Sequence, residues 1–148
     1  EDTKLEGRRM LDVGTGSGVL AIAASRLGVT SLVAVDIDAV AIENARLNLH
    51  VNLGEEHVSQ RVILQQGSAK DAGDEPFDVI VANIESHILL PMVPDLLQRL
   101  GKGGCIIFSG LLRREERTFI DGLIESGLTI DGRWQRDDWF SCRAYVVD

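Results

Sequence analysis

Short apolar runs alternate with helix-like segments along almost the whole of this chain of 148 residues. The runs that favour buried strands occupy residues 5–13, 31–37, 61–65, 77–82 and 105–109. Helices are predicted at 19–27, from an N-cap at Asp38 to about Leu53, at 87–100 and at 113–126, with only a brief helical turn in 67–75. Such alternation specifies a parallel sheet with helices on both faces, because right-handed crossovers leave few other topologies. Residues 128–147 predict a hairpin of two strands around Asp137 and Asp138.

The length and composition are those of one globular α/β domain. With 45% hydrophobic and 26% charged residues, the chain belongs to neither the disordered nor the fibrous class. The net charge of −8 disfavours direct binding to nucleic acid and favours a basic partner. No apolar run approaches the roughly 18 residues of a membrane span, and no signal segment opens the chain.

Cysteine and histidine usage gives no sign of a disulfide scaffold or a metal site. Cys105 and Cys142 are too few and too far apart, and the three histidines share no metal-ligand spacing. We therefore expect a cytoplasmic protein with reduced, buried thiols. The chain opens with Glu1 and reaches its first apolar strand almost at once, so we expect a domain excised from a longer protein. Nothing in the sequence predicts the oligomeric state.

Gly14, Gly16 and Gly18 form a turn directly after the first predicted strand. Without side chains, the backbone of such a turn lets a ligand approach, and the following helix N-terminus offers free N–H groups. The dinucleotide-binding fingerprint would place its third glycine at position 19, which is Val19, and the lysine of a phosphate-binding loop is absent. The turn therefore predicts a ligand site of another kind.

Polar residues end two further predicted strands. Asp36 closes the second strand about 20 residues after the glycine turn, where a carboxylate accepts hydrogen bonds from two ribose hydroxyls, so it suits a nucleoside. Asp38 is explained by capping the next helix. Asn83 follows the fourth strand, where its side-chain carbonyl could hold an amine or could instead satisfy a loop backbone.

The segment from Asp12 to Gly18 resembles motif I of the class I S-adenosylmethionine-dependent methyltransferases, and Val35 to Asp38 resembles motif II. Further segments make the chain similar to the ribosomal protein L-eleven methyltransferase (PrmA) family over almost its whole length. These are residues 11–20, Ala41 with Asn44, 82–84, 102–104, 109–112 and the aromatic segment at 138–140. The resemblance implies a doubly wound, Rossmann-like seven-stranded mixed sheet in a single domain, covering residues 1–148.

The resemblance also implies a role for each matching residue. The methionine end of S-adenosylmethionine would be bordered by Gly14, Thr15, Gly16 and Gly18, and Asp12 would help to hold its amino group. Asp36 would bind the ribose, Ile37 would lie against the adenine, and Ser68 and Ala69 would approach the adenine edge. Asn83 would face both the methyl group and the incoming amine, and would be the catalytic residue.

Two departures from the family pattern bear on the substrate. The usual Asn-Ile-Leu-Ala is Asn83-Ile84-Glu85-Ser86 here. The family also carries an N-terminal substrate-recruiting domain, joined by a segment with its own glycine-rich cofactor contact, and this chain contains neither. The residues that match imply methylation of protein amino groups, with a basic ribosomal protein, L-eleven, as the partner.

A sulfonium cofactor already carries a good leaving group, so such an enzyme mainly aligns an unprotonated amine, which Asn83 can do without titrating. Two alternatives remain open at this point. One is a methyltransferase that uses the same cofactor site on a small molecule or another protein. The other is a catalytically silent binding module. An NAD-dependent dehydrogenase is disfavoured by Val19 and by the lack of a placed catalytic acid.

Overall fold

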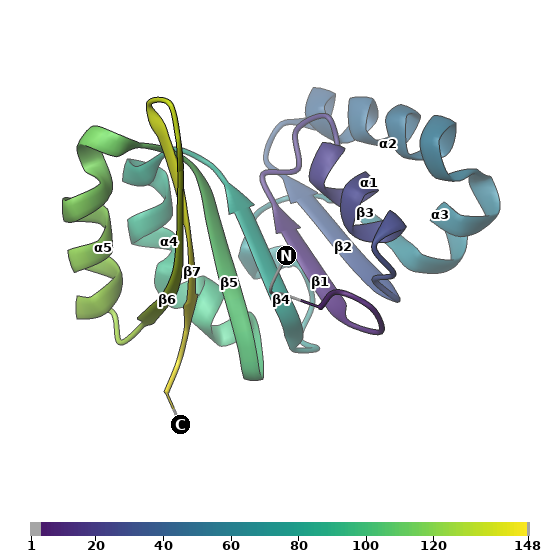
Figure 1. Cartoon of the computed structure of the whole chain (residues 1–148). Coiled ribbons are helices and arrows are strands. Elements are labelled where there is room, and N and C mark those ends of the chain that lie inside the picture. The colour runs from purple at the N-terminus through teal and green to yellow at the C-terminus, as the bar shows by residue number, and fades with distance from the viewer. Residues whose placement is uncertain (1–3, 148) are drawn as a thin grey trace.

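In the computed structural model, which describes residues 4–147, seven strands form one mixed sheet in the order β3-β2-β1-β4-β5-β7-β6 (Figure 1). The strands are β1 (Arg9–Val13), β2 (Ser31–Asp36), β3 (Val62–Gln66), β4 (Phe77–Asn83), β5 (Leu100–Leu112), β6 (Thr129–Arg136) and β7 (Trp139–Tyr145). The first five are parallel, whereas β7 pairs antiparallel with both β5 and β6. The expected doubly wound seven-stranded mixed sheet is confirmed.

Helices cover the two faces of the sheet unequally (Figure 1). They are α1 (Val19–Arg26), α2 (Ala39–Leu53), α3 (Glu55–Arg61), α4 (Ser86–Arg99) and α5 (Glu116–Glu125), with 3-10 turns at Ala69–Asp71 and Arg113–Glu115. One core packs α1, α2 and α3 against one face, and a larger core packs α4 and α5 against the other. Among the described residues no helix lies over β5, β7 and β6 on the α1 face, and Cys105 and Ile107 of β5 stay half-buried there.

Most predicted elements are present, and the differences lie where glycines change the local geometry. Helix α3 was not predicted: Gly54, with a φ of 84°, ends α2 and starts a short helix that has Glu55 and Glu56 in its first turn and buries Val58. The first strand begins only at Arg9, because Gly7 adopts a φ of 76° in a preceding turn. The predicted hairpin is confirmed, with its turn at Asp137.

Strand β5 is longer at both ends than the predicted 105–109. Its glycines continue the strand, with register irregularities, because Gly101 and Gly104 lie directly against β4. A Cβ at Gly104 would come within 2.9 Å of the carbonyl oxygen of Asp78. Helix α4 contains both Pro91 and Pro94, which lie on its exposed side, so water can satisfy the carbonyl groups that lose their helical N–H partners.

Within residues 4–147, every helix falls short of the length and hydropathy that a membrane-spanning helix needs. Both cysteines are free. Cys142 is buried in the sheet, and this burial raises the pKa of its thiol to about 12, so it stays protonated. Burial also raises the pKa of Cys105.

The larger core contains three phenylalanine rings in edge-to-face contact. Phe119 of α5 lies edge-on to Phe108 of β5, at 5.5 Å between centroids, and edge-on to Phe140 of β7, at 6.1 Å. All three side chains are buried.

Because the contact of Phe119 with these rings fixes α5 on the antiparallel end of the sheet, we expect Phe119→Ala to lower the free energy of unfolding by about 3–5 kcal/mol. Urea denaturation with Ile124→Ala, an exposed change on the same helix, as control tests this, and a loss below about 1 kcal/mol would contradict it.

Candidate functional site

The glycine turn after β1 crosses the end of the neighbouring strand β2. The N–H groups of Gly14 and Thr15 both donate to the carbonyl oxygen of Val35, at 2.9 and 3.0 Å. Gly14 has a φ of 72°, and a Cβ there would lie 2.7 Å from Cγ1 of Ile84. Gly16, with a φ of 54°, has nothing within 4 Å of a Cβ position, so the turn faces open space at that point. The chain geometry thus requires glycine at Gly14 and leaves room beside Gly16.

Asp12 lies beneath this turn with a fully buried side chain. One carboxylate oxygen, Oδ2, accepts a hydrogen bond from the Thr15 hydroxyl at 2.7 Å, while Oδ1 has no hydrogen-bond partner. Burial raises the pKa of Asp12 to about 6. The Thr15 hydrogen bond opposes this rise, and the carboxylate of Asp36 adds to it. A buried carboxylate with one unpaired oxygen is suited to a hydrogen-bond donor or a cation.

Asp36, at the end of β2, bridges the glycine turn and the next helix. Its Oδ2 accepts a hydrogen bond from the N–H of Gly16 at 2.9 Å, and its Oδ1 accepts one from the N–H of Asp38 at 3.0 Å. A carboxylate has about four lone-pair sites, so both oxygens keep acceptor capacity. Asp38 accepts a hydrogen bond from the N–H of Val40 at 2.8 Å and caps α2, as expected.

A cavity of about 280 Å³ opens at this edge of the sheet, beside the ends of β1, β2 and β4. It brings together five of the residues singled out in the sequence. These are Gly14, Asp36, Ile37, Ser68 and Asn83. The cavity therefore lies at the carboxyl ends of the parallel strands, on both sides of β1, where open α/β sheets bind their ligands.

The other predicted residues lie around the cavity and do not line it. Asp12 and Thr15 are buried under the turn, and Gly18 forms the N-cap of α1 with a φ of 81°. The Gly16 N–H is directed to Asp36. Ala69 is buried in the larger core, because it begins the 3-10 turn that packs against α4.

The position of Ser68 is fixed by a capping box. Its N–H and its hydroxyl both donate to Oδ2 of Asp71, at 2.8 and 3.1 Å. These hydrogen bonds lower the pKa of Asp71, which is fully exposed. The loop after β3 is thus held in one conformation at the rim of the cavity.

Asn83, the last residue of β4, is exposed and pairs in register with Ser109 of β5. Gly110, with a φ of 74°, packs so closely against it that a Cβ at this glycine would collide with Oδ1 of Asn83. The amide oxygen is therefore confined on the β5 side, while Asn83 lines the cavity.

Sequence reasoning missed the apolar wall of the cavity. Ile84, Ile88 and Met92 line it from the loop after β4 and from α4. Ile88 and Met92 lie four residues apart on one face of α4, and Ile84 lies two residues before the start of that helix. That spacing was readable from the sequence, but the adjacent stripe of Leu89, Val93 and Leu96 faces the core and gives the same periodic signal.

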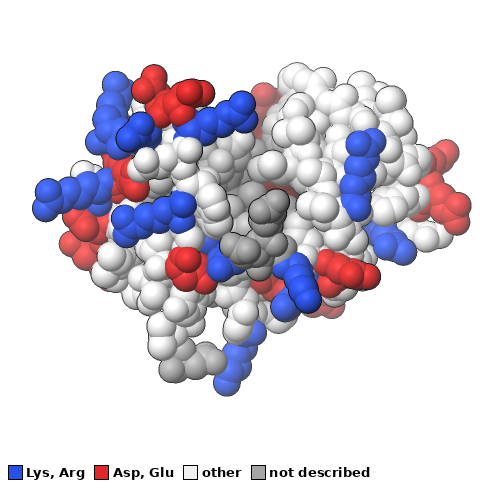
Figure 2. Space-filling model, in the orientation of Figure 1, with Lys and Arg blue, Asp and Glu red and all other residues white. Residues whose placement is uncertain are grey.

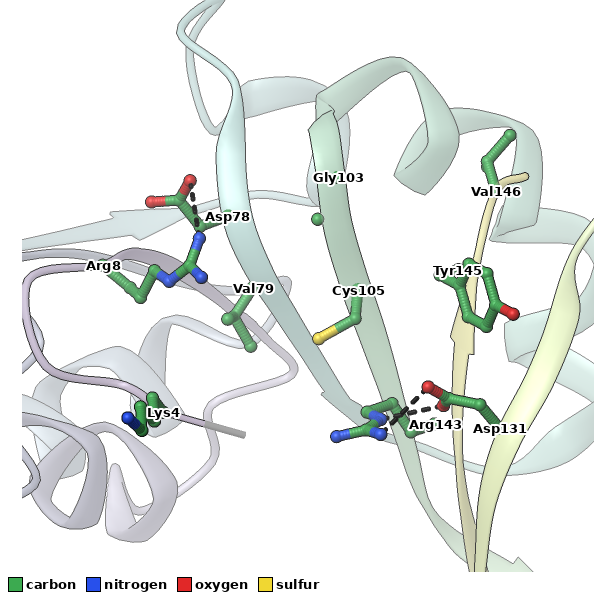
Figure 3. Close-up of a pocket in the computed structure, with 11 residues that line it drawn as sticks. Lys4, Arg8, Asp78, Val79, Gly103, Cys105, Asp131, Arg143, Tyr145 and Val146 are labelled. Atoms are coloured by element: carbon green, nitrogen blue, oxygen red, sulfur yellow. Dashed lines mark hydrogen bonds and ion pairs between the residues drawn. The ribbon is translucent and has the colours of Figure 1, made fainter. Parts of the chain in front are cut away.

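A second cavity, of about 250 Å³, lies at the opposite edge, where β1, β4 and β5 begin (Figure 3). Four of its charged side chains are paired with one another: Arg143 donates two hydrogen bonds to Asp131, at 2.8 and 2.9 Å, and Arg8 lies 3.7 Å from Asp78. This edge is not where sheets of this kind bind ligands. Among residues 4–147, no group of three or more metal-ligating side chains comes together.

The surface charge does not form a single patch on the face of Figure 2. Blue and red side chains are interspersed on it, and a broad uncharged area covers the α1 and α2 region. Val19 of α1, Leu27 directly after α1 and Val51 of α2 are exposed apolar residues.

Comparison with known proteins gives consistent matches. The family model described as ribosomal protein L11 methyltransferase (PrmA) matches residues 1–146. Proteins named ribosomal protein L11 methyltransferase are 40% identical over 139 residues in Anoxybacillus flavithermus and 41% identical over 133 residues in Geobacillus kaustophilus. These matches cover 94% and 90% of this chain but 43% and 41% of those proteins, so the chain spans less than half of their length.

Solved structures agree with these sequence matches. The ribosomal protein L11 methylase of Lactobacillus delbrueckii superposes with a TM-score of 0.87 at 34% identity, covering 95% of this chain and 71% of that one. A putative RNA methyltransferase from Pyrococcus horikoshii has a TM-score of 0.78 at 21% identity, covers 97% of this chain and 78% of that one, and shows the shared fold alone. The chain belongs to the ribosomal protein L11 methyltransferase (PrmA) family, whose fold and activity imply the use of S-adenosylmethionine.

Proposed function

We propose that this chain binds S-adenosylmethionine in the cavity beside the glycine turn and takes part in transferring its methyl group to an amino group of ribosomal protein L11. The observation that carries the proposal is the meeting of Gly14, Asp36 and Asn83 on one cavity at the carboxyl edge of the sheet. The names of the relatives support the choice of substrate. A net charge of −8 is compatible with a basic protein partner.

Two details of the site fit the cofactor. Oδ1 of Asp12 is buried without a partner, so it can accept a hydrogen bond from an ammonium or water-bridged donor. Gly16 faces open space where a side chain would fill the approach to the turn. The residues around this cavity therefore fit a ligand with an amino group at one end and a nucleoside at the other.

Each residue has a distinct part in this arrangement. The glycine turn and Asp12 would hold the methionine end, and Asp36 would accept the ribose hydroxyls with its remaining lone pairs. Ile37, which is 78% exposed, would cover the adenine together with the apolar wall of Ile88 and Met92. Ser68 and the backbone at Ala69 would border the adenine edge.

When bound, S-adenosylmethionine supplies a methyl group on a sulfonium sulfur, which is already a good leaving group. Asn83 would accept a hydrogen bond from the substrate amine through Oδ1 and orient its lone pair towards the methyl group. An amide does not titrate, so Asn83 orients the amine and removes no proton from it. The apolar wall would exclude water from the nucleoside side of the site.

The first test is calorimetric titration of the chain with S-adenosylhomocysteine, with NAD as the control ligand. We expect binding of S-adenosylhomocysteine alone, followed by transfer of labelled methyl groups to purified ribosomal protein L11. Binding of NAD, or of neither ligand, would contradict the proposed cofactor. Binding without transfer to L11 would contradict the proposed substrate.

Asp36→Ala should weaken S-adenosylhomocysteine binding by about 10- to 100-fold, because it removes hydrogen bonds to a charged acceptor. Calorimetry measures the dissociation constant, and circular dichroism checks that the variant is folded. The matched control is Asp38→Ser, which keeps a capping oxygen two residues away and should change the affinity by no more than about twofold. Equal affinities for the wild type and Asp36→Ala would remove Asp36 from the ribose site.

Asn83→Ala should lower kcat by about 100-fold while changing the affinity for S-adenosylhomocysteine much less, because the lost amide positions the amine. Single-turnover methylation of L11 gives the rate, and calorimetry gives the affinity. If both quantities fall by the same factor, Asn83 holds the cofactor and has no separate role towards the amine.

Asp12 makes stability depend on pH. Its folded pKa of about 6 lies above the ordinary pKa of 3.8 that it has in the unfolded chain, so between these pH values the unfolded chain loses a proton that the folded chain keeps. The free energy of unfolding should therefore fall by about 2 kcal/mol relative to Asp12→Asn as the pH rises from 4 to 7. Saturating S-adenosylhomocysteine should reduce this fall, because its ammonium stabilises the carboxylate. Parallel pH profiles of the two proteins in urea denaturation would contradict the role of Asp12.

A further inference from the structure

A third cavity, of about 260 Å³, adjoins the proposed methyl-transfer site. The start of α4, the end of β5, the 3-10 turn that precedes α5 and the start of β7 form its walls. The residues that line it are Glu85, Ser86, His87, Gly110, Leu112, Arg114, Glu115 and Trp139. None of them has a part in the function proposed above.

The backbone after β4 separates this cavity from the first one. Asn83 and Ile84 line the first cavity, whereas Glu85 lines the third. On the far side, Gly110 lines the third cavity and packs directly against the amide of Asn83. A substrate side chain bound in the third cavity would therefore lie close to the substrate amine that Asn83 orients.

The walls combine carboxylates with an exposed indole. Ser86 donates a hydrogen bond from its hydroxyl to Oε2 of Glu115 at 3.0 Å, which fixes that carboxylate. Oε2 of Glu85 lies 3.4 Å from Nδ1 of His87, and Trp139 is 53% exposed. Carboxylates bind ammonium and guanidinium groups, and the face of an indole attracts the same cations. Arg114 lines the cavity with the opposite charge, so the walls have two carboxylates to one guanidinium.

We propose that this cavity binds a second cationic side chain of the protein substrate, a lysine or arginine close to the amino group that is methylated. The proposal rests on the proposed function, because it extends the same substrate site. The bound cation is not the reacting amine. Carboxylates stabilise the protonated form of an amine, whereas methyl transfer requires the neutral form. The two adjoining cavities thus separate a charged anchor from a neutral nucleophile.

We assign Glu85 as a specificity-determining residue that selects substrates with paired positive charges, because it supplies one of the two carboxylates on the walls of this cavity.

The two tryptophans of the chain allow a direct binding test. The chain is labelled with ¹⁵N and titrated with Nα-acetyl-lysine methylamide in the presence of S-adenosylhomocysteine, and the two indole N–H signals are followed by NMR. Trp139 lines the cavity and Trp134 does not, so we expect a saturable shift of the Trp139 signal alone. The control probe is the norleucine methylamide, which has a similar chain without the charge. A similar Trp139 shift with this probe, or no shift with the lysine probe, would overturn the proposal.

Variants then identify the groups responsible. Glu85→Leu combined with Glu115→Gln should weaken binding of the lysine probe by about three- to tenfold, the range of exposed ion pairs and cation–π contacts. Glu55→Gln, an equal loss of charge on α3, should leave it unchanged. Unchanged binding in the double variant would overturn the assignment of the two glutamates. All these side chains are partly or fully exposed, so the fold does not depend on them.

A kinetic comparison links the cavity to catalysis. Peptides with a target lysine beside a second lysine should be methylated with a kcat/KM about three- to tenfold higher than peptides in which norleucine replaces the second lysine. Glu85→Leu should reduce this ratio. An unchanged ratio overturns the subsite but not the proposed function. Failure to bind S-adenosylhomocysteine or to methylate any peptide overturns the proposed function, while the Trp139 titration without cofactor still tests the cavity.

Discussion

The two hydrogen bonds from Gly14 and Thr15 to the carbonyl oxygen of Val35 determine the geometry of the whole ligand-binding edge. They carry the chain from β1 across the end of β2 and bring the N–H of Gly16 to the carboxylate of Asp36. The same crossing places α1 beside α2, where Gly18 lies against Ala45. Because the crossing requires a φ of 72° and close contact with Ile84, a side chain at Gly14 would disturb the turn and the cavity wall together. The fold and the candidate site therefore share one backbone constraint.

Buried Asp12 shows how such a site differs from a core optimised for stability. A fully buried carboxylate with one unpaired oxygen destabilises the folded state once it ionises. The apolar residues on either side of it, Leu11 and Val13, lie in the core without any such penalty. A polar group kept in this position is expected where binding of a ligand offsets the unfavourable burial. Thr15 compensates only in part, through one hydrogen bond.

The sequence pattern was sufficient for the order of the strands along the chain and of every helix except α3, because the buried strands β1, β2 and β4 form nearly continuous apolar runs. Prediction from the sequence pattern failed where one residue type is compatible with two local structures. The predicted strand begins at residue 105, yet Gly101 and Gly104 let β5 begin at Leu100 and lie directly against β4. For the site, the strand ends at Asp36 and Asn83 indicated the correct edge, since the carboxyl ends of parallel strands meet there. The burial of Ala69 and the contact of Gly110 with Asn83 depend on long-range packing, which a local pattern does not contain.

All the side chains of this protein that absorb strongly near 280 nm lie on one hairpin. The chain has two tryptophans and one tyrosine, and they are Trp134 on β6 with Trp139 and Tyr145 on β7. The larger core, in contrast, contains phenylalanines and aliphatic residues. Intrinsic fluorescence and near-ultraviolet absorbance therefore record the surroundings of the β6–β7 hairpin, at the antiparallel edge of the sheet. The opposite half of the molecule, built on β1, β2 and β3, is optically silent in this range, so local opening at either end of the sheet can be told apart by comparing these signals with the amide circular dichroism.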